Sequence, residues 1–284
     1  MTAQNIVKNE THVKTKTYWE NAIDYARKYD VDLSGMVVCL DNGHSKATKG
    51  KGSPWSLHKV EPAIPLREYE FARKVVAKLK ELLENMGARV YLVCPEVDTE
   101  TSLSARAARA NKLKTVYKEE GKSIKFVFVS VHADAIGDGT KWVPGSNGWA
   151  VWTTKGQNVS DIFADCMWEA ANEVFTPMGM RMRQQKANDG DPDYEADFTV
   201  IKKANMPAVL TENFFYTDPG DCAFISSEAG VEAIAVAHAK GIGKFAQRRY
   251  GHKTRAEYRK ERDERDKEIE KLYEEKFGKQ NAPN

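Results

Sequence analysis

Short apolar runs rich in β-branched residues recur along this chain, and each one stops at glycine or polar residues. Each run has the length of a buried strand and is too short for an ordinary helix. We predict strands at 36–40, 89–93, 125–131, 148–153 and 207–211.

Longer segments lie between these runs, and their apolar residues recur every three or four positions, the spacing of one helix face. The clearest segment covers 67–86 and ends at Gly87. The alternation predicts an α/β fold, with an open, mostly parallel twisted sheet of about six strands and helices on both faces. Further helices are predicted at 102–119, 158–175 and 227–247.

Both ends of the chain differ from this alternating pattern. Residues 17–29 have helical spacing, and 252–277 form a charged stretch with a thin apolar stripe. Pairs one turn apart, such as Glu261 with Arg265, favour a solvated helix there, and self-association or docking through 252–277 is the alternative. We therefore predict an N-terminal extension (1–34), a central domain (35–250) and a charged helical C-terminal tail (251–284).

The composition narrows the classes of protein to consider. The 284 residues carry a formal net charge of +2, which gives no argument for a nucleic-acid partner. No apolar run is long enough to insert into a membrane, and the first residues lack the pattern of a secretory signal, so we expect synthesis in the cytoplasm. The cysteines show no CxxC pairing, and we expect buried, reduced thiols at Cys39, Cys94, Cys166 and Cys222.

Histidines and a glutamate stand where the predicted strands end. His44 and His132 each follow a strand, and Glu212 follows the last one. In such sheets ligands bind beyond the carboxyl ends of the strands, so we expect these side chains to meet at one edge. Gly43 would let the backbone approach a bound ion, and Asp41 would orient an imidazole through a hydrogen bond.

These residue types suit a zinc hydrolase. Two imidazoles and one carboxylate can hold a zinc ion and leave a fourth position open for water, as catalytic zinc requires. The first turn of the helix at 67–86 offers that carboxylate from either Glu68 or Glu70, and spacing alone does not choose between them. Glu212 is costly to bury without a purpose and can manage the protons of the reaction.

Five segments, in order, resemble the motifs of the zinc-dependent N-acetylmuramoyl-L-alanine amidases of the amidase 3 family. LDNGHS resembles the family's D-P-G-H-G, and LSARAARAN resembles L-x-x-R-x-x-x-A-N. FVSVHADA is similar to the family's S-I-H-A-N strand, and MPAVLTENFFYTDPGD to P-A-V-L-V-E-x-G-F-x-S-N-x-x-D. EYEFARKVVAKLKELLENMG resembles the family's glutamate-bearing helix, and counting back from Gly87 puts that glutamate on Glu68.

The resemblance covers roughly residues 36–247 and implies both a site and a substrate. It implies that one zinc ion per chain is bound by His44, Glu68 and His132, and that Glu212 is the catalytic glutamate. The implied substrate is peptidoglycan, cleaved at the amide that joins the lactyl group of N-acetylmuramic acid in the glycan to L-alanine of the stem peptide. With no secretory signal, we expect a phage or prophage endolysin that acts on the bacterial cell wall after release.

The chain departs from the family's motifs beside these residues. Asn42 stands where the family has proline, and Ser45-Lys46 follow His44 in place of paired glycines. Asp134 replaces an asparagine, and Asn213-Phe214 replaces an apolar residue and a glycine. We expect these departures to affect contacts with the substrate and not the reaction.

Two other functions stay open on the sequence alone. A zinc carboxypeptidase-like peptide amidase would need an arginine to clamp the terminal carboxylate of its substrate, and Arg106 is the candidate. A non-catalytic wall-binding or virion structural protein would be expected to lack a ligand or Glu212, and all four residues are present.

Overall fold

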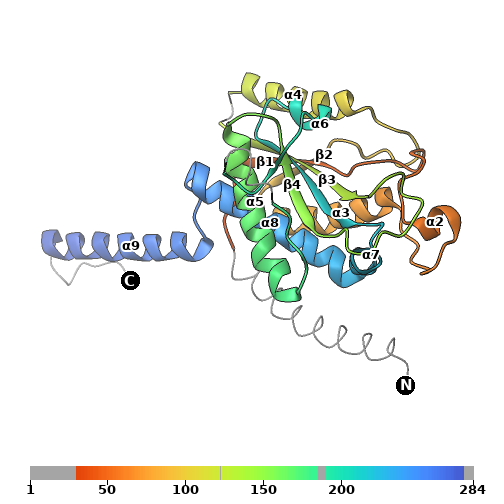
Figure 1. The fold of residues 1–284 in the computed structure, drawn as a ribbon. Helices are drawn as coiled ribbons and strands as arrows, with labels where there is room; N and C mark the ends of the chain where they lie inside the picture. Colours follow the sequence, from red (N-terminus) through yellow and green to blue (C-terminus); the bar gives the residue numbers. More distant parts are fainter. Residues whose placement is uncertain (1–29, 122, 185–189, 278–284) are drawn as a thin grey trace.

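Six strands form one sheet in the order β2-β1-β3-β6-β4-β5, with helices on both faces (Figure 1). The computed structural model describes residues 30–121, 123–184 and 190–277. The predicted α/β fold with a six-stranded sheet is confirmed. The strands are β1 (Met36–Asp41), β2 (Arg89–Leu92), β3 (Lys125–Asp134), β4 (Trp149–Thr153), β5 (Tyr194–Glu195) and β6 (Ala208–Phe215).

Two of the strands run against the other four. β1 pairs in parallel with β2 and β3, and β3 pairs in parallel with β6. β4 is antiparallel to β6, and β5 pairs in parallel with β4. The direction reverses because no helix separates β3 from β4 along the chain, whereas a parallel neighbour needs a crossover connection. The sheet is therefore mostly parallel, as predicted, with a reversed pair at one edge.

The helices divide between the two faces of the sheet (Figure 1). α3 (Glu68–Asn85), α5 (Val159–Phe175) and α8 (Glu228–Tyr250) cover one face. α4 (Leu103–Glu119) and the short α6 (Thr199–Lys202) cover the other. The remaining helices are α2 (Pro54–His58), η1 (Thr176–Met178), α7 (Pro219–Ser226) and α9 (Arg255–Phe277).

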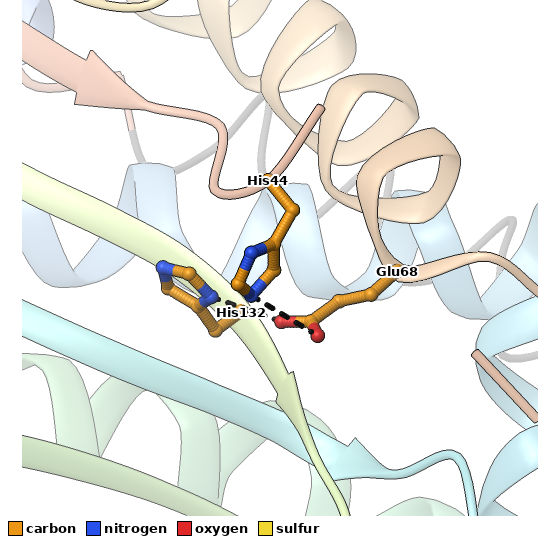
Figure 2. Close-up of side chains that lie close together, drawn as sticks. All are labelled: His44, Glu68 and His132. Atoms are coloured by element: carbon orange, nitrogen blue, oxygen red, sulfur yellow. Dashed lines mark hydrogen bonds and ion pairs between the residues drawn. The ribbon is translucent and has the colours of Figure 1, made fainter. Parts of the chain in front are cut away.

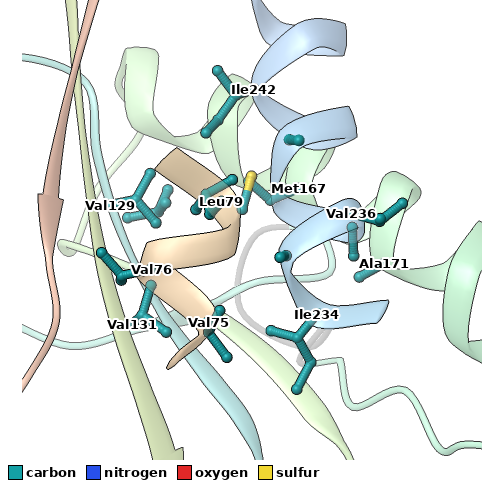
Figure 3. Close-up of a cluster of buried hydrophobic side chains, with 14 of the residues drawn as sticks. Val75, Val76, Leu79, Val129, Val131, Met167, Ala171, Ile234, Val236 and Ile242 are labelled. Carbon is teal, nitrogen blue, oxygen red and sulfur yellow. The ribbon is translucent and has the colours of Figure 1, made fainter. Parts of the chain in front are cut away.

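The larger part of the core lies between the sheet and α3, α5 and α8 (Figure 3). Val75 and Leu79 of α3 gather there with Val129 of β3, Met167 of α5 and Ile234 of α8, and all five are buried. Each aliphatic side chain of this kind contributes about 1.5–3 kcal/mol by leaving water. A smaller cluster joins the other face to α4 and α6. With both faces covered, the sheet is a firm support for the loops at its edge.

Two strands extend further than their apolar runs predict. β3 continues to Asp134 and β6 to Phe215, so His132 and Glu212 lie inside strands and not beyond them. The two strands pair along this extra length, with His132 opposite Glu212 and Asp134 opposite Phe215. The prediction of loops around 45–65 and 183–197 was also incomplete, because these stretches contain the short elements α2 and β5.

The first described residues lie beside the segment that leads into α9. Val31 forms a bridge with Thr254, and Arg255 makes an ion pair with Asp30 at 3.2 Å. From this point α9 projects away from the rest of the molecule (Figure 1), so the charged helix predicted at 252–277 is present. Its self-association and the division of the chain at 34 and 250 stay predictions. The helix predicted at 17–29 lies outside the described residues.

The cysteines are free and buried, as predicted. Burial raises the pKa of the Cys39 thiol to about 12, which keeps it protonated and unreactive at neutral pH. Among the described residues, no helix has both the length and the apolar character that a membrane crossing requires.

Candidate metal centre

Three elements bring His44, Glu68 and His132 together at the carboxyl end of the sheet (Figure 2). His44 lies on the loop after β1, Glu68 is the first residue of α3, and His132 lies in β3. Glu68 Oε1 is 2.9 Å from His132 Nδ1, and Glu68 Oε2 is 3.4 Å from His44 Nε2. Each of the three residues offers one ligand atom, a histidine nitrogen or a glutamate oxygen, and these three atoms lie within 4.8 Å of one another.

Glu68, and not Glu70, faces the histidines. The amide of Glu68 donates a hydrogen bond to the carbonyl of Lys51, which fixes the point where α3 begins. Its side chain is then 1% exposed, and its Oε1 also accepts a hydrogen bond from the amide of Ala133 at 3.2 Å. Glu70 is exposed and pairs with the neighbouring Tyr69. The start of the helix therefore places Glu68, and not Glu70, where a shared contact with both histidines is possible.

Gly43 shapes the turn that carries His44. Its φ of +68° lies in the left-handed region that favours glycine, and a Cβ there would lie 3.1 Å from His132 Cε1. Glycine thus lets this turn pack against the ring of His132. The prediction was a different one, that Gly43 lets the backbone approach a bound ion. Arg73 holds the next peptide by donating from Nη1 to the carbonyl of His44 at 2.5 Å.

Asp41 does not orient an imidazole, so that prediction was wrong. It is fully buried, and its Oδ2 accepts a hydrogen bond from Ser130 Oγ at 2.7 Å. Its Oδ1 accepts from the amide of Gly43 and from Arg106 Nη1, both at 3.2 Å. Within the described residues no hydrogen bond joins Asp41 to either histidine. Its role is to fix the turn after β1 to β3 and α4.

Arg106 is committed to this internal network. It is 1% exposed, donates from Nε to the carbonyl of Thr101 at 2.8 Å, and pairs with both Asp41 and Glu100. A guanidinium held in this way cannot clamp the carboxylate of a substrate. The arginine that a carboxypeptidase would need is therefore not Arg106.

Burial and pairing set the charges of the three residues. Burial lowers the pKa of His44 to about 4, although the charge of Glu68 acts in the opposite sense. Burial alone would raise the pKa of Glu68, but the hydrogen bond and charge of His132 bring it below its usual value. For His132, burial favours the neutral ring, and the hydrogen bond with Glu68 raises its pKa overall. A neutral His44 and an ionised Glu68 are the forms in which these groups bind metals.

The donor set fits zinc. Two imidazoles with one carboxylate form a recurrent catalytic zinc set, and the carboxylate is ionised. Glu68 Oε2 is buried and makes no hydrogen bond within the described residues. His44 Nε2 lies 3.4 Å from this oxygen without forming a hydrogen bond to it, and a cation between the carboxylate and the two rings would remove the cost of burying it in this state.

Glu212 lies beside this group on the neighbouring strand. It stands opposite His132 in the pairing of β3 with β6, and its Oε2 is buried without a hydrogen bond among the described residues. Burial, together with the negative charge of Asp134, raises the pKa of Glu212 to about 8. The arrangement can therefore place a proton-exchanging carboxylate next to a bound cation.

Asn213, which the sequence analysis named only as a departure from the family's motif, and Arg183, which it did not name, brace this part of the sheet. Asn213 is buried, donates from Nδ2 to the carbonyl of His132 at 2.9 Å, and accepts from Trp149 Nε1 at 2.7 Å. It thereby ties β3, β4 and β6 together around His132. Arg183 pairs with Asp134 at 2.8 Å, and it comes from a stretch predicted to be loop. Neither contact leaves a signal in local spacing, because each joins residues far apart in the chain.

Phe214 stands where the resembling family has glycine. Its φ is 68°, a conformation that bulky side chains rarely adopt. The ring is fully buried against Phe175 and Phe224, with centroids 5.0 and 5.2 Å away. Aromatic packing thus compensates for an unfavourable backbone two residues after Glu212.

Known proteins resemble the chain in sequence and in fold. The profile of a family described as N-acetylmuramoyl-L-alanine amidase matches residues 38–244. The endolysin of Bacillus phage SPP1 is 25% identical over 212 residues, which are 74% of this chain and 65% of that protein. The N-acetylmuramoyl-L-alanine amidase CwlM of Bacillus licheniformis is 26% identical over 214 residues, which are 74% of this chain and 68% of that protein.

Solved structures extend the likeness to the fold. The N-acetylmuramoyl-L-alanine amidase from Clostridium difficile 630 superposes with a TM-score of 0.60 at 23% identity, over 76% of this chain and 99% of the other. At that identity the likeness shows the fold alone. The chain spans about two thirds of the length of the curated relatives that it matches.

Proposed function

The chain belongs to the N-acetylmuramoyl-L-alanine amidase family, and we propose that it is a peptidoglycan hydrolase. It would cleave the amide between N-acetylmuramic acid and L-alanine of the stem peptide. The observation that carries the proposal is that His44, Glu68 and His132 lie together beside Glu212 at the carboxyl ends of the central strands.

In the proposed enzyme His44, Glu68 and His132 hold one zinc ion per chain. Zinc supplies the Lewis acidity that an amide requires, because the amide carbonyl is a poor electrophile and water a poor nucleophile. The donor set and the buried Oε2 of Glu68, which makes no hydrogen bond among the described residues, support this assignment.

Glu212 is the proposed catalytic residue. Its carboxylate takes a proton from the attacking water and delivers it to the leaving nitrogen of L-alanine. In the metal-free chain burial raises the pKa of Glu212 above its usual value, and a carboxyl shifted in this direction suits a group that must both accept and release a proton. The contacts of Asn213 with the backbone of His132 and with Trp149 keep β6 in place, so Glu212 stays in register with His132.

The two other functions considered from the sequence have less support. The carboxypeptidase-like function loses its clamp, because Arg106 is buried in ion pairs. The binding module is disfavoured because none of the four site residues is missing. We further propose a role in lysis of the cell wall, supported by the likeness to a phage endolysin.

Purified sacculi test the proposal. Incubation with the chain should release stem peptides with a new free amino group on L-alanine and leave the glycan intact. A chelator should stop the release, and added zinc should restore it. Release of peptides by cleavage at another bond, or no release by zinc-loaded protein, would contradict the proposal. The Glu212→Gln variant is the matched control, because it keeps the proposed metal ligands and removes the proton acceptor.

A further inference from the structure

Arg183 is held in place at the edge of the site by its own backbone. Its amide donates to the carbonyl of Trp149 at 2.8 Å, and its carbonyl accepts from Trp168 Nε1 at 2.9 Å. Gly148 permits this close approach, since a Cβ there would lie 3.0 Å from both Arg181 O and Arg183 Cγ. The segment is therefore fastened to β4 before any substrate arrives.

The guanidinium of Arg183 is also held. Nη2 bonds to Asp134 Oδ2 at 2.8 Å, and Cζ lies 4.5 Å from the ring centroid of Phe215 and 5.5 Å from that of Tyr194. Asp134 and Phe215 are paired residues of β3 and β6, just beyond His132 and Glu212. Arg183 and Asp134 are close enough to Glu212 that their charges act on it in opposite senses.

Part of this fixed cation remains unused. Within the described residues Nη1 makes no hydrogen bond, Nε is buried without a hydrogen-bond partner, and the side chain keeps 15% of its surface exposed. An arginine needed only to neutralise Asp134 would not require a position that is also fixed by its own backbone and by two aromatic rings. A preorganised guanidinium of this kind is suited to bind a carboxylate.

The charges around the site indicate which part of the substrate needs such a group. The proposed zinc ion would offset the charge of Glu68, but a substrate carboxylate on the far side of His132 would meet Asp134 and needs a cation beside that residue. In the proposed substrate the lactyl carboxyl is consumed in the scissile amide, so the acids nearest the bond belong to the stem peptide. Asp134 lies two strand residues beyond His132, roughly 7 Å along β3, which suits a group on the residue after L-alanine.

We propose that Arg183 is a substrate-positioning residue that binds the first carboxylate of the stem peptide beyond L-alanine. The inference rests on the proposed function and adds the orientation in which the substrate would lie across the site. The peptide would cross the β6–β4 side of the site, and the glycan would lie on the opposite side, over the loop after β1.

Two muramyl peptides distinguish this role. They share the sequence N-acetylmuramoyl-L-alanyl-γ-D-glutamyl-L-lysine, in which lysine is joined to the γ-carboxyl, and the α-carboxyl of the glutamyl residue is free in one and amidated in the other. Binding is measured by calorimetry in the Glu212→Gln chain, which prevents turnover. We expect the free acid to bind more tightly, and Arg183→Gln to weaken its binding about 10- to 100-fold while the amide changes by less than about threefold.

Matched variants separate this role from a structural one. Arg181 is exposed on the same segment, so Arg181→Gln should leave the preference for the acid unchanged. The double variant Asp134→Asn with Arg183→Gln leaves no unpaired acid and should lose the preference as fully as Arg183→Gln. Equal affinity for the two peptides, binding of neither, or an equal loss for both on Arg183→Gln overturns the inference.

The failure of the proposed function would look different. Turnover of the free-acid peptide is measured in parallel with the chain that retains Glu212. Arg183-dependent binding of the acid without release of the L-alanyl peptide would uphold the role of Arg183 and refute the amidase. Cleavage with no preference between the two peptides would do the reverse.

Discussion

Glu212→Gln should change activity and stability in opposite directions. The substitution keeps the shape of the side chain and removes its charge. Loss of a group that accepts and delivers a proton costs about 10²- to 10⁴-fold in turnover. The same change should stabilise the metal-free chain near neutral pH, because the folded state holds this carboxylate in surroundings that disfavour its ionised form.

The pH range of the effect follows from the direction of the shift. The pKa of Glu212 rises from 4.5 to about 8 on folding, so the folded state binds this proton more tightly than the unfolded state. Below pH 4.5 the group is protonated in both states and costs nothing. Between 4.5 and about 8 the cost grows by about 1.4 kcal/mol per pH unit, and above that range it stays constant. Because the residue keeps some exposure, we expect a total on the order of 1–3 kcal/mol at pH 7.5.

Thermal unfolding in a chelator measures this difference. The melting temperatures of the two chains should nearly coincide at pH 4.5 and separate as the pH rises, with Glu212→Gln higher by roughly 2–6 °C at pH 7.5. A variant that melts lower than the parent at pH 7.5, or a gap that does not depend on pH, would refute the reasoning. Near-normal turnover would remove Glu212 from the reaction.

Three further changes test other parts of the structure. His132→Ala should lose both bound zinc and activity, measured by metal analysis after dialysis, and an unaltered zinc content would show that the ligand is misassigned. Phe214→Gly should relieve about 1 kcal/mol of backbone strain and lose about 3–5 kcal/mol of aromatic burial, so denaturant unfolding should show a less stable chain; a gain in stability would mean that strain outweighs packing. Deleting 256–284 keeps the bridge from Val31 to Thr254 and should leave turnover of soluble muramyl peptides intact, and an unfolded product would contradict a purely peripheral helix.

The strands and long helices were predictable because their apolar spacing reflects which face is buried. The runs at 36–40 and 125–131 became β1 and β3, and they brought His44 and His132 to the expected edge. The direction of β4 was missed because its apolar run looks the same in either direction; the signal was the lack of a predicted helix between 125–131 and 148–153. Strand ends were also misplaced, since pairing of β3 with β6 continues past the apolar stretch.

The candidate site also has features that the sequence predicted and features that it did not. Spacing left Glu68 and Glu70 equal, and the choice depends on where α3 begins, which the backbone contacts of Glu68 with Lys51 and of Arg67 with Gly52 fix. The sequence predicted the wrong partner for Asp41, because Arg106 and Ser130, which donate hydrogen bonds to it, belong to elements distant in sequence. Such contacts depend on tertiary packing and leave no local pattern.

X-ray absorption at the zinc edge tests the central claim most directly. For the chain loaded with one equivalent of zinc, the account predicts two imidazole nitrogens and one carboxylate among the ligands, at about 2.0–2.2 Å. Glu68→Gln should weaken the binding, and Glu70→Gln should leave the spectrum unchanged. A zinc ion with sulfur ligands, a spectrum without imidazole, or a chain that retains no zinc would contradict it.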